Sequence, residues 1–252
     1  MGRDAAPKLI GILAGMGPRS TAPFVDLVVD ECQRQYGARD DLDFAPMLIY
    51  SLPTPFYIDR PIDHAALEAT IRAGLRKLED SGVAFIAMPC NSAHIYFERL
   101  APSIHVPLLN MVDVALGALP AAARSVALLA TRPTLESRLY QDALDRAGLR
   151  VLAGETWQAR VDELILAIKT SAERAAAISL WQALVADLES DGADTLLLAC
   201  TDLNAVSATG GTRLALVDAT RCLAEAVVGQ WLQIEGKEPA LTTKMPRHQE
   251  IE

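Results

Sequence analysis

Short runs of consecutive apolar residues alternate along the chain with longer segments that mix apolar and polar residues. Such runs are typical of strands buried on both faces, and the mixed segments have the periodicity of helices. The runs predicted to be strands are residues 9–14, 47–51, 85–88, 107–111, 125–130, 150–153, 195–199 and 214–217. The segments predicted to be helical are 19–35, 64–81, 92–100, 133–148, 160–190 and 219–233. This alternation predicts an α/β fold with helices on both faces of parallel sheets.

The segment 64–81 illustrates how the pattern predicts a helix. Its apolar residues recur at spacings of four, four and three, which places them on one side of a helix: Leu67, Ile71, Leu75 and Leu78. Asp63 precedes the segment as a residue type that caps helices, and Gly82 follows its end. We expect the apolar side to pack on a sheet, so this helix is interpreted as structural.

The order of the predicted elements occurs twice along the chain. Residues 85–91 and 195–201 show the repeat most sharply, because each is an apolar run that ends in a cysteine followed by Asn or Thr. The repeat predicts two similar Rossmann-like subdomains, each a short parallel sheet flanked by helices, with a cleft between them. The predicted boundaries are residues 1–117 with 219–236 for the first subdomain, 118–218 for the second, and 237–252 for a mobile tail.

Composition and charge narrow the class of protein. An apolar fraction of 51% and a charged fraction of 22% exclude a disordered chain. The net charge of −9, from 23 Lys and Arg against 32 Asp and Glu, argues against nucleic acid as a partner. No apolar run approaches the roughly eighteen residues of a membrane span, so we expect no membrane partner and a cytoplasmic location.

Two of the four cysteines occupy matching places in the repeat. Cys90 and Cys200 each end a predicted strand, and each is followed by residue types that begin helices. Ligands of open α/β sheets bind beyond the carboxyl ends of strands, where a helix N-terminus favours negative charge. We therefore expect the two thiols to face each other across the cleft. Cys32 and Cys222 lie inside predicted helices and are interpreted as packing residues.

A pair of thiols on opposite sides of a substrate carbon suits one reaction in particular. One thiolate removes a proton from one face of the carbon, and the opposite thiol gives a proton to the other face. The product is the mirror image of the substrate, and the reaction requires neither a metal nor an organic cofactor.

Other interpretations of these residues stay open. Each cysteine is also compatible with a small core residue, and the pair with a disulfide. Cys90 and His94 could form a metal site with Cys200 and Asp202, although a Cys-x3-His spacing alone carries little weight. His94 is interpreted as a histidine satisfied within its helix, with a role in tuning Cys90 as the alternative.

At these residues the chain resembles the aspartate/glutamate racemase family, the amino-acid racemases that use no cofactor. The matching motifs are the glycine-rich segment 11–18, the cysteine motif 89–94, Cys200 with Thr201, residues 130–134 and Tyr140. The resemblance covers residues 10–232. It implies a pair of α/β subdomains with the active site between them, no cofactor, a small acidic amino acid as substrate, and a homodimer.

The resemblance also implies roles for individual residues. Cys90 and Cys200 would be the two acid/base thiols. Arg60 would hold the side-chain carboxylate of the substrate, with help from Lys169. An arginine fork pairs well with a carboxylate, and these cations would have to overcome the negative charge of the chain. The other substrate-binding residues that the resemblance implies are Met16, Asn91, Ser92, Thr134 and Thr201.

The chain departs from the family pattern at three positions. Asp202 stands where the family has Glu, Ser92 where it often has Thr, and Arg19 where it often has an acidic residue. The shorter Asp202 could shift the geometry of the second cysteine motif. Arg19 would add positive charge near the mouth of the cleft.

The leading hypothesis is racemisation of aspartate or glutamate by Cys90 and Cys200. Other reactions of the superfamily are hydantoin racemisation, maleate cis–trans isomerisation and malonate decarboxylation, of which the last is disfavoured because it uses a single thiol. A binding protein for dicarboxylates is an alternative of another class, but a pure binder has no need of two matching thiols.

Overall fold

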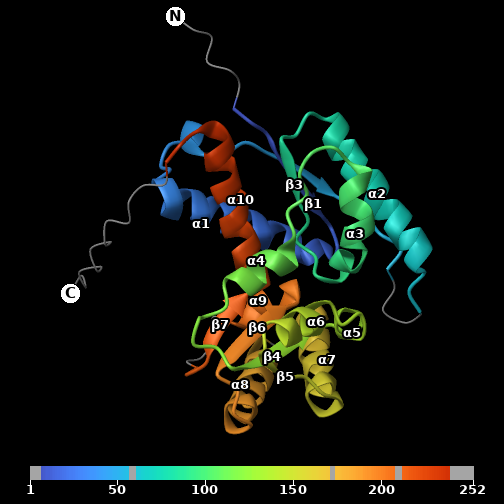
Figure 1. The fold of residues 1–252 in the computed structure, drawn as a ribbon, viewed down its shortest axis with the longest axis vertical. Helices are drawn as coiled ribbons and strands as arrows, with labels where there is room; N and C mark the ends of the chain where they lie inside the picture. Colours follow the sequence, from blue (N-terminus) through green and yellow to red (C-terminus); the bar gives the residue numbers. More distant parts are fainter. Residues whose placement is uncertain (1–6, 57–60, 171–173, 208–211, 239–252) are drawn as a thin grey trace, which may run out of the picture.

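The computed structural model describes residues 7–56, 61–170, 174–207 and 212–238 of the 252-residue chain. Within these residues the strands form two separate parallel sheets, and helices flank both. Figure 1 shows the sheet of the N-terminal strands above the other sheet. The arrangement confirms the predicted α/β fold with two short parallel sheets.

The first sheet has three parallel strands in the order β2–β1–β3. They are β2 (Met47–Ser51), β1 (Ile10–Ala14) and β3 (Phe85–Ala87). Successive side chains of a strand point to opposite faces of the sheet. In the central strand β1, Ile10, Ile12 and Ala14 therefore enter one apolar core, and Leu13 enters another. The burial of both faces explains why this strand is an unbroken apolar run.

A helix covers each face of this sheet. α1 (Thr21–Tyr36) packs in the core that contains Ile10, and α2 (His64–Asp80) packs in the core that contains Leu13. Asp63 caps α2 by accepting a hydrogen bond of 3.0 Å from the N–H of Ala66. The four apolar residues predicted to share one side of α2 are all buried, so the prediction for this helix is confirmed.

The segment 107–111, predicted as a strand, does not form one. A single bridge joins Leu108 to Ile86 of β3, and the helix α4 (Met111–Gly117) begins directly afterwards. The reason is Asn110, whose side chain accepts a backbone hydrogen bond of 3.0 Å from the first turn of the helix. This residue therefore ends the extended segment by capping α4.

The second sheet has four parallel strands in the order β5–β4–β6–β7. They are β5 (Arg150–Leu152), β4 (Ser125–Ala130), β6 (Thr195–Ala199) and β7 (Ala215–Asp218). The central strands β4 and β6 are buried along their whole length, as the first sheet's central strand is. Their side chains alternate between the core they share with the first sheet and a separate core beneath this sheet.

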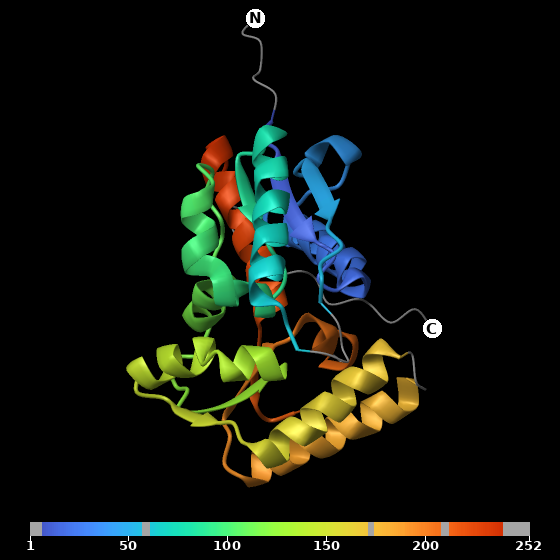
Figure 2. The same cartoon turned by 90° about the vertical axis from the view of Figure 1, so that its right-hand side faces the viewer.

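The prediction of one helix over 160–190 is wrong. Two helices occupy this region, α7 (Glu155–Lys169) and α8 (Arg174–Ser190), and they lie side by side on one face of the second sheet (Figure 2). A single helix of this length would extend about 46 Å at 1.5 Å per residue, beyond the short sheet. Two shorter helices bring both apolar faces onto the same core.

Two other predicted helices are divided. The segment 92–100 forms the 3-10 helix η3 (Ser92–Tyr96) and α3 (Phe97–Leu100), followed by η4 (Ala101–Ser103). The segment 133–148 forms α5 (Arg132–Glu136) and α6 (Leu139–Arg146). The remaining short elements are η1 (Pro18–Ser20), η2 (Asp41–Asp43), η5 (Thr201–Leu203) and α9 (Asn204–Ser207).

The last helix brings the end of the chain back to the first sheet. α10 (Ala219–Glu235) follows β7 and packs against α1 and α4. Asp218 caps it by accepting a hydrogen bond of 2.8 Å from the N–H of Thr220. The indole N–H of Trp231, a buried residue of α10, donates to the Lys8 carbonyl at 2.9 Å, just before β1.

The predicted subdomain boundaries, 1–117 with 219–236 against 118–218, stay a prediction. Most of the predicted tail, residues 239–252, lies outside the described residues. In the part of the chain that the structure describes, no helix is both long enough and apolar enough to cross a membrane.

Gly15, directly after β1, occupies a position where a side chain has no room. Its φ is +92°, and a Cβ atom there would lie 2.5 Å from the backbone nitrogen of Leu52. Gly37 also has a positive φ, +74°, but no atom lies within 4 Å of the equivalent point. We expect Gly15→Ala to lower the free energy of unfolding by about 2–4 kcal/mol and Gly37→Ala by about 1 kcal/mol, measured by urea denaturation. Equal losses for the two variants would contradict this account.

Candidate active site

A cavity of about 390 Å³ lies where strands of both sheets end. Its wall consists of residues at or just beyond the carboxyl ends of β1, β2, β3, β4 and β6, and of residues from α2. Because β1 to β3 belong to the first sheet and β4 and β6 to the second, the cavity lies between the two sheets. Parallel α/β sheets bind their ligands at this edge.

Cys90 and Cys200 both line this cavity, one from each sheet. Cys200 is buried and directly follows β6. Cys90 is partly buried and follows β3 by three residues, and its N–H donates to the Met88 carbonyl at 2.8 Å. Cys32 and Cys222 pack in or against the core, as predicted, and neither lines the cavity. All four cysteines are among the described residues, and none forms a disulfide.

Asp202 lies beside the second thiol. The Sγ atom of Cys200 donates a hydrogen bond to the Oδ2 atom of Asp202 at 3.9 Å. Thr201 and Asp202 belong to η5 and also line the cavity. The aspartate therefore reaches the thiol although its side chain is one methylene shorter than the glutamate of the family pattern.

His94 holds the backbone of the first cysteine. This buried imidazole bonds through Nδ1 to the Cys90 carbonyl at 2.8 Å, and its Nε2 accepts from the N–H of Met111 at 3.1 Å. Because a backbone N–H can only donate, the proton of the neutral ring lies on Nδ1. Burial lowers the pKa of His94 below its ordinary value, which keeps the ring neutral. This geometry supports the interpretation of His94 as a satisfied buried histidine.

Three hydroxyl groups join the sheets at the cavity. Ser92 Oγ, from η3, lies 3.0 Å from the Oγ1 atoms of Thr131 and Thr134, and these two are 3.0 Å apart. Each hydroxyl can donate to one neighbour and accept from the other, so the ring satisfies itself. Ser92 and Thr131 line the cavity, whereas Thr134 is fully buried behind them.

A second bond between the sheets orients Asn91. The hydroxyl of Tyr140, in α6, donates to the Oδ1 atom of Asn91 at 2.5 Å, and both side chains are buried. Burial raises the pKa of Tyr140, so its hydroxyl stays protonated. The amide nitrogen of Asn91 has no partner among the described residues, although Asn91 lines the cavity. A buried donor without a partner is costly unless a ligand supplies an acceptor.

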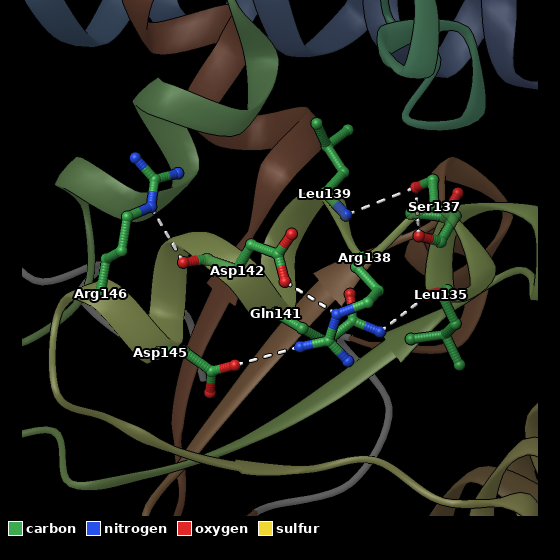
Figure 3. A network of polar contacts seen from close by, with 9 residues as sticks. Leu135, Ser137, Arg138, Leu139, Gln141, Asp142, Asp145 and Arg146 are labelled. Atoms are coloured by element: carbon green, nitrogen blue, oxygen red, sulfur yellow. Dashed lines mark hydrogen bonds and ion pairs between the residues drawn. The ribbon is translucent and has the colours of Figure 1, made fainter.

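Polar contacts hold the turn between α5 and α6, the helix that carries Tyr140 (Figure 3). Arg138 has a φ of 57° there, which is uncommon for a residue with a side chain. Its guanidinium donates to Asp142 at 2.8 Å and to Asp145 at 3.2 Å. These bonds tie the left-handed turn to α6.

The described residues that line the cavity carry little charge. Asp202 is the only charged side chain among the described residues that line the cavity. Arg60 lies outside the described residues, and Lys169 is the last residue of α7, with its side chain outside them. Arg19 is exposed in η1 and does not line the cavity.

The metal alternative finds no support. Across the described ranges, no group of three or more His, Cys, Asp or Glu side chains is placed to hold a metal ion. This includes the set of Cys90, His94, Cys200 and Asp202 considered from the sequence. Both ring nitrogens of His94 are already used in hydrogen bonds to the backbone.

Comparisons with known proteins identify the family of the chain. The sequence model of the Asp/Glu/hydantoin racemase family matches residues 13–227. The chain belongs to this family. The broad specificity amino-acid racemase RacX of Bacillus subtilis (strain 168) is 45% identical to this racemase-family chain over 224 residues, which are 89% of this chain and 98% of RacX.

Two solved structures of racemases share the fold. The Picrophilus torridus aspartate racemase superimposes on this family member with a TM-score of 0.77 and 25% identity, over 92% of this chain and 96% of that one. The glutamate racemase isoform RacE1 from Bacillus anthracis gives a TM-score of 0.65 and 14% identity, over 92% and 83% of the two chains. The resemblance seen in the sequence is thereby confirmed, as is the fold of two parallel sheets flanked by helices.

The structure brings most of the predicted site residues to one cavity. The predicted residues that line the cavity are Met16, Cys90, Asn91, Ser92, Cys200 and Thr201. Thr134 is one residue removed from the wall, behind Ser92. What each of these residues does for a substrate stays a prediction.

Some residues of the wall were missed by the sequence analysis. Thr131 directly follows β4 as Cys200 follows β6, and this equivalence was the signal that could have found it. Leu67 and Ile71 were assigned to packing alone, yet both also line the cavity. Helical spacing cannot separate a core-facing side chain from one that faces a cavity, because both lie on the buried side.

The neutral state of His94 predicts how stability depends on pH. The unfolded chain takes up a proton on this residue near pH 6.5, and the native state does not, so stability falls as the pH drops below about 6.5. We expect a slope of up to about 1.4 kcal/mol per pH unit between roughly pH 6.5 and 5, measured by urea denaturation.

Two variants test whether His94 causes this dependence of stability on pH. His94→Gln should flatten it and also destabilise the protein at neutral pH. His105→Gln should keep the slope, because His105 is exposed. A slope that survives in His94→Gln would contradict the assignment.

Proposed function

We propose that the protein is a cofactor-independent racemase of amino acids that acts on aspartate or glutamate by proton transfer between Cys90 and Cys200. The observation that carries the proposal is that these two thiols, from equivalent strand ends of two different sheets, line one cavity. The broad specificity amino-acid racemase RacX supports amino acids as substrates, and the aspartate racemase of Picrophilus torridus supports an acidic one.

The two thiols begin in opposite protonation states. The thiolate takes the proton from Cα of the substrate and becomes a thiol. The thiol on the other side gives its proton to the opposite face and becomes a thiolate. One proton leaves the carbon and one arrives, so the cycle ends with the roles exchanged and the enzyme ready for the mirror-image substrate.

Neighbouring groups would support the two thiols. Asp202 accepts the thiol hydrogen of Cys200, which holds that sulfur in a fixed direction. His94 accepts from the backbone of α4 and donates to the Cys90 carbonyl, which holds the first cysteine. Placement of reacting groups within a few tenths of an ångström is what makes proton transfer efficient.

The polar wall offers donors for the charged ends of an amino acid. The amide nitrogen of Asn91, which has no partner among the described residues, suits the α-carboxylate. The hydroxyl of Thr201 also lines the cavity, and the Ser92 oxygen has a second lone pair that can accept from the ammonium group. We assign the side-chain carboxylate of an acidic substrate to Arg60 and Lys169, as the sequence resemblance implies.

We keep three further expectations as proposals. The protein acts as a homodimer, it acts in the cytoplasm, and it uses neither nucleic acid nor membrane as a partner. The dimer follows from the resemblance, and the other two follow from the composition and the net charge of −9.

Exchange of the α-proton with solvent tests the function. In heavy water, both enantiomers of aspartate or of glutamate should lose the α-proton signal in proton NMR, and the optical rotation should decay to zero. Cys90→Ala and Cys200→Ala should each reduce racemisation by about 10²–10⁴-fold, because each removes one of the two acid/base groups. Cys222→Ala is the matched control and should keep activity, since Cys222 does not line the cavity.

Three outcomes would contradict the proposal. One is full racemisation by either single-cysteine variant. Another is turnover of maleate or a hydantoin without exchange of any amino acid. The third is tight binding of a dicarboxylate in calorimetry without exchange, which would identify a binding protein.

A further inference from the structure

We propose that Tyr140 is a positioning residue that makes the amide of Asn91 present its nitrogen, and not its oxygen, to the cavity. The site at Asn91 then accepts a carboxylate and rejects an ammonium group. The inference rests on the proposed function, because it takes the α-carboxylate of the substrate as the group that Asn91 binds. It adds a residue that does not line the cavity and that determines which end of the amino acid lies at Asn91.

The side chain of Asn91 ends in two groups of similar size and opposite hydrogen-bonding character. The amide oxygen only accepts hydrogen bonds, and the amide nitrogen only donates them. Turning the amide over exchanges the two groups, so shape alone does not determine which one faces a ligand. Asn91 is buried and lines the cavity, so its orientation decides whether an acceptor or a donor binds there.

The hydroxyl of Tyr140 fixes this orientation. It lies 2.5 Å from the Oδ1 atom of Asn91 and forms no other hydrogen bond among the described residues. Burial raises the pKa of Tyr140, so the hydroxyl keeps its hydrogen. If the amide turned over, its nitrogen would face the hydroxyl oxygen, and the hydroxyl hydrogen would lose its acceptor. Since a buried donor without an acceptor is costly, the observed orientation is the stable one.

The surroundings hold both partners of this bond in place. Tyr140 has no exposed surface and belongs to the apolar core that the two sheets share. The carbonyl of Asn91 accepts a hydrogen bond of 3.0 Å from the N–H of His94, which fixes the backbone that carries the amide. Because the ring and this backbone are both fixed, the bond between the two side chains controls the direction of the amide.

The orientation leaves the amide nitrogen of Asn91 as a donor that needs a partner. No acceptor for it is present among the described residues. A buried donor in the wall of a cavity indicates a ligand that supplies an acceptor. The α-carboxylate of an amino acid is such an acceptor, whereas the α-ammonium group only donates and would meet the hydrogens of the amide.

Two fragments of aspartate test which end of the substrate Tyr140 acts on. Succinate is aspartate without the ammonium group, and β-alanine is aspartate without the α-carboxylate. Both are measured as competitive inhibitors of the exchange of the aspartate α-proton in heavy water. If the enzyme exchanges glutamate instead, the corresponding pair is glutarate and γ-aminobutyrate.

We expect Tyr140→Phe to raise the inhibition constant of succinate about tenfold. Without the hydroxyl, the oxygen of Asn91 has no donor behind it and turns toward the solvent in the cavity, so the nitrogen is presented only about a tenth of the time. The inhibition constant of β-alanine should change by less than about twofold, because this fragment has no carboxylate for Asn91 to bind. A general disturbance of the cavity would weaken both fragments alike.

A control and a double variant show whether Tyr140 acts through Asn91. Tyr36→Phe removes another tyrosine hydroxyl, which donates to the carbonyl of Asp43 at 2.9 Å away from the cavity, and it should leave both constants unchanged. Asn91→Ala should weaken succinate by itself, and adding Tyr140→Phe to it should weaken succinate no further.

A second variant tests the orientation even where Tyr140→Phe does not fold. Asn91→Asp keeps an acceptor for the hydroxyl of Tyr140 and replaces the donor that faces the cavity with an acceptor. It should therefore weaken succinate and strengthen β-alanine. An unchanged ratio of the two inhibition constants in Asn91→Asp would show that the amide nitrogen does not face the ligand, and would overturn the inference.

The other outcomes separate the role of Tyr140 from the proposed function. If Tyr140→Phe weakens both fragments equally or neither of them, or if it weakens succinate further in the Asn91→Ala background, the inference is wrong and the proposed function stands. Exchange of no amino acid by the unaltered protein would overturn the proposed function and the inference together.

Discussion

Two thiols can serve one carbon atom only while the sheets that carry them keep a fixed separation. The hydrogen bonds that cross between the sheets at the cavity provide this constraint. Ser92, two residues after Cys90, bonds to Thr131 and Thr134 beyond the end of β4, and Asn91 bonds to Tyr140 in α6. Because these partners are buried or line the cavity, water competes little for the bonds, and the first cysteine loop is held against the second sheet.

The cavity combines walls of different origin. Loops at strand ends supply polar groups suited to the parts that all amino acids share, namely the Cα atom, the carboxylate and the ammonium group. α2 supplies an apolar surface, and Leu67 and Ile71 belong at once to that surface and to the core. A change that reshapes the cavity at these residues therefore also disturbs the packing of α2 on β1.

Much of the fold could be predicted because β1, β4 and β6 are buried on both faces. Each of these strands therefore stands out in the sequence as an unbroken run of apolar or small residues. The cysteine pair could be predicted because the chain repeats. The prediction of a strand at 107–111 was wrong because the side chain of Asn110 caps a helix there. Contacts between distant segments, such as Tyr140 with Asn91, leave no periodic trace, so the donors they orient could not be derived from spacing.

The return of α10 to the first sheet has a consequence for synthesis of the chain. The core around Ile10 and Phe24 is completed by Val227, Val228 and Trp231 near the end of the sequence. The first half of this core is made some two hundred residues before the second, so the core around Ile10 and Phe24 cannot close until α10 has been made. The second sheet enters the same core through Val126, Leu128 and Leu197, so one side of each sheet reaches its native packing only with the last helix.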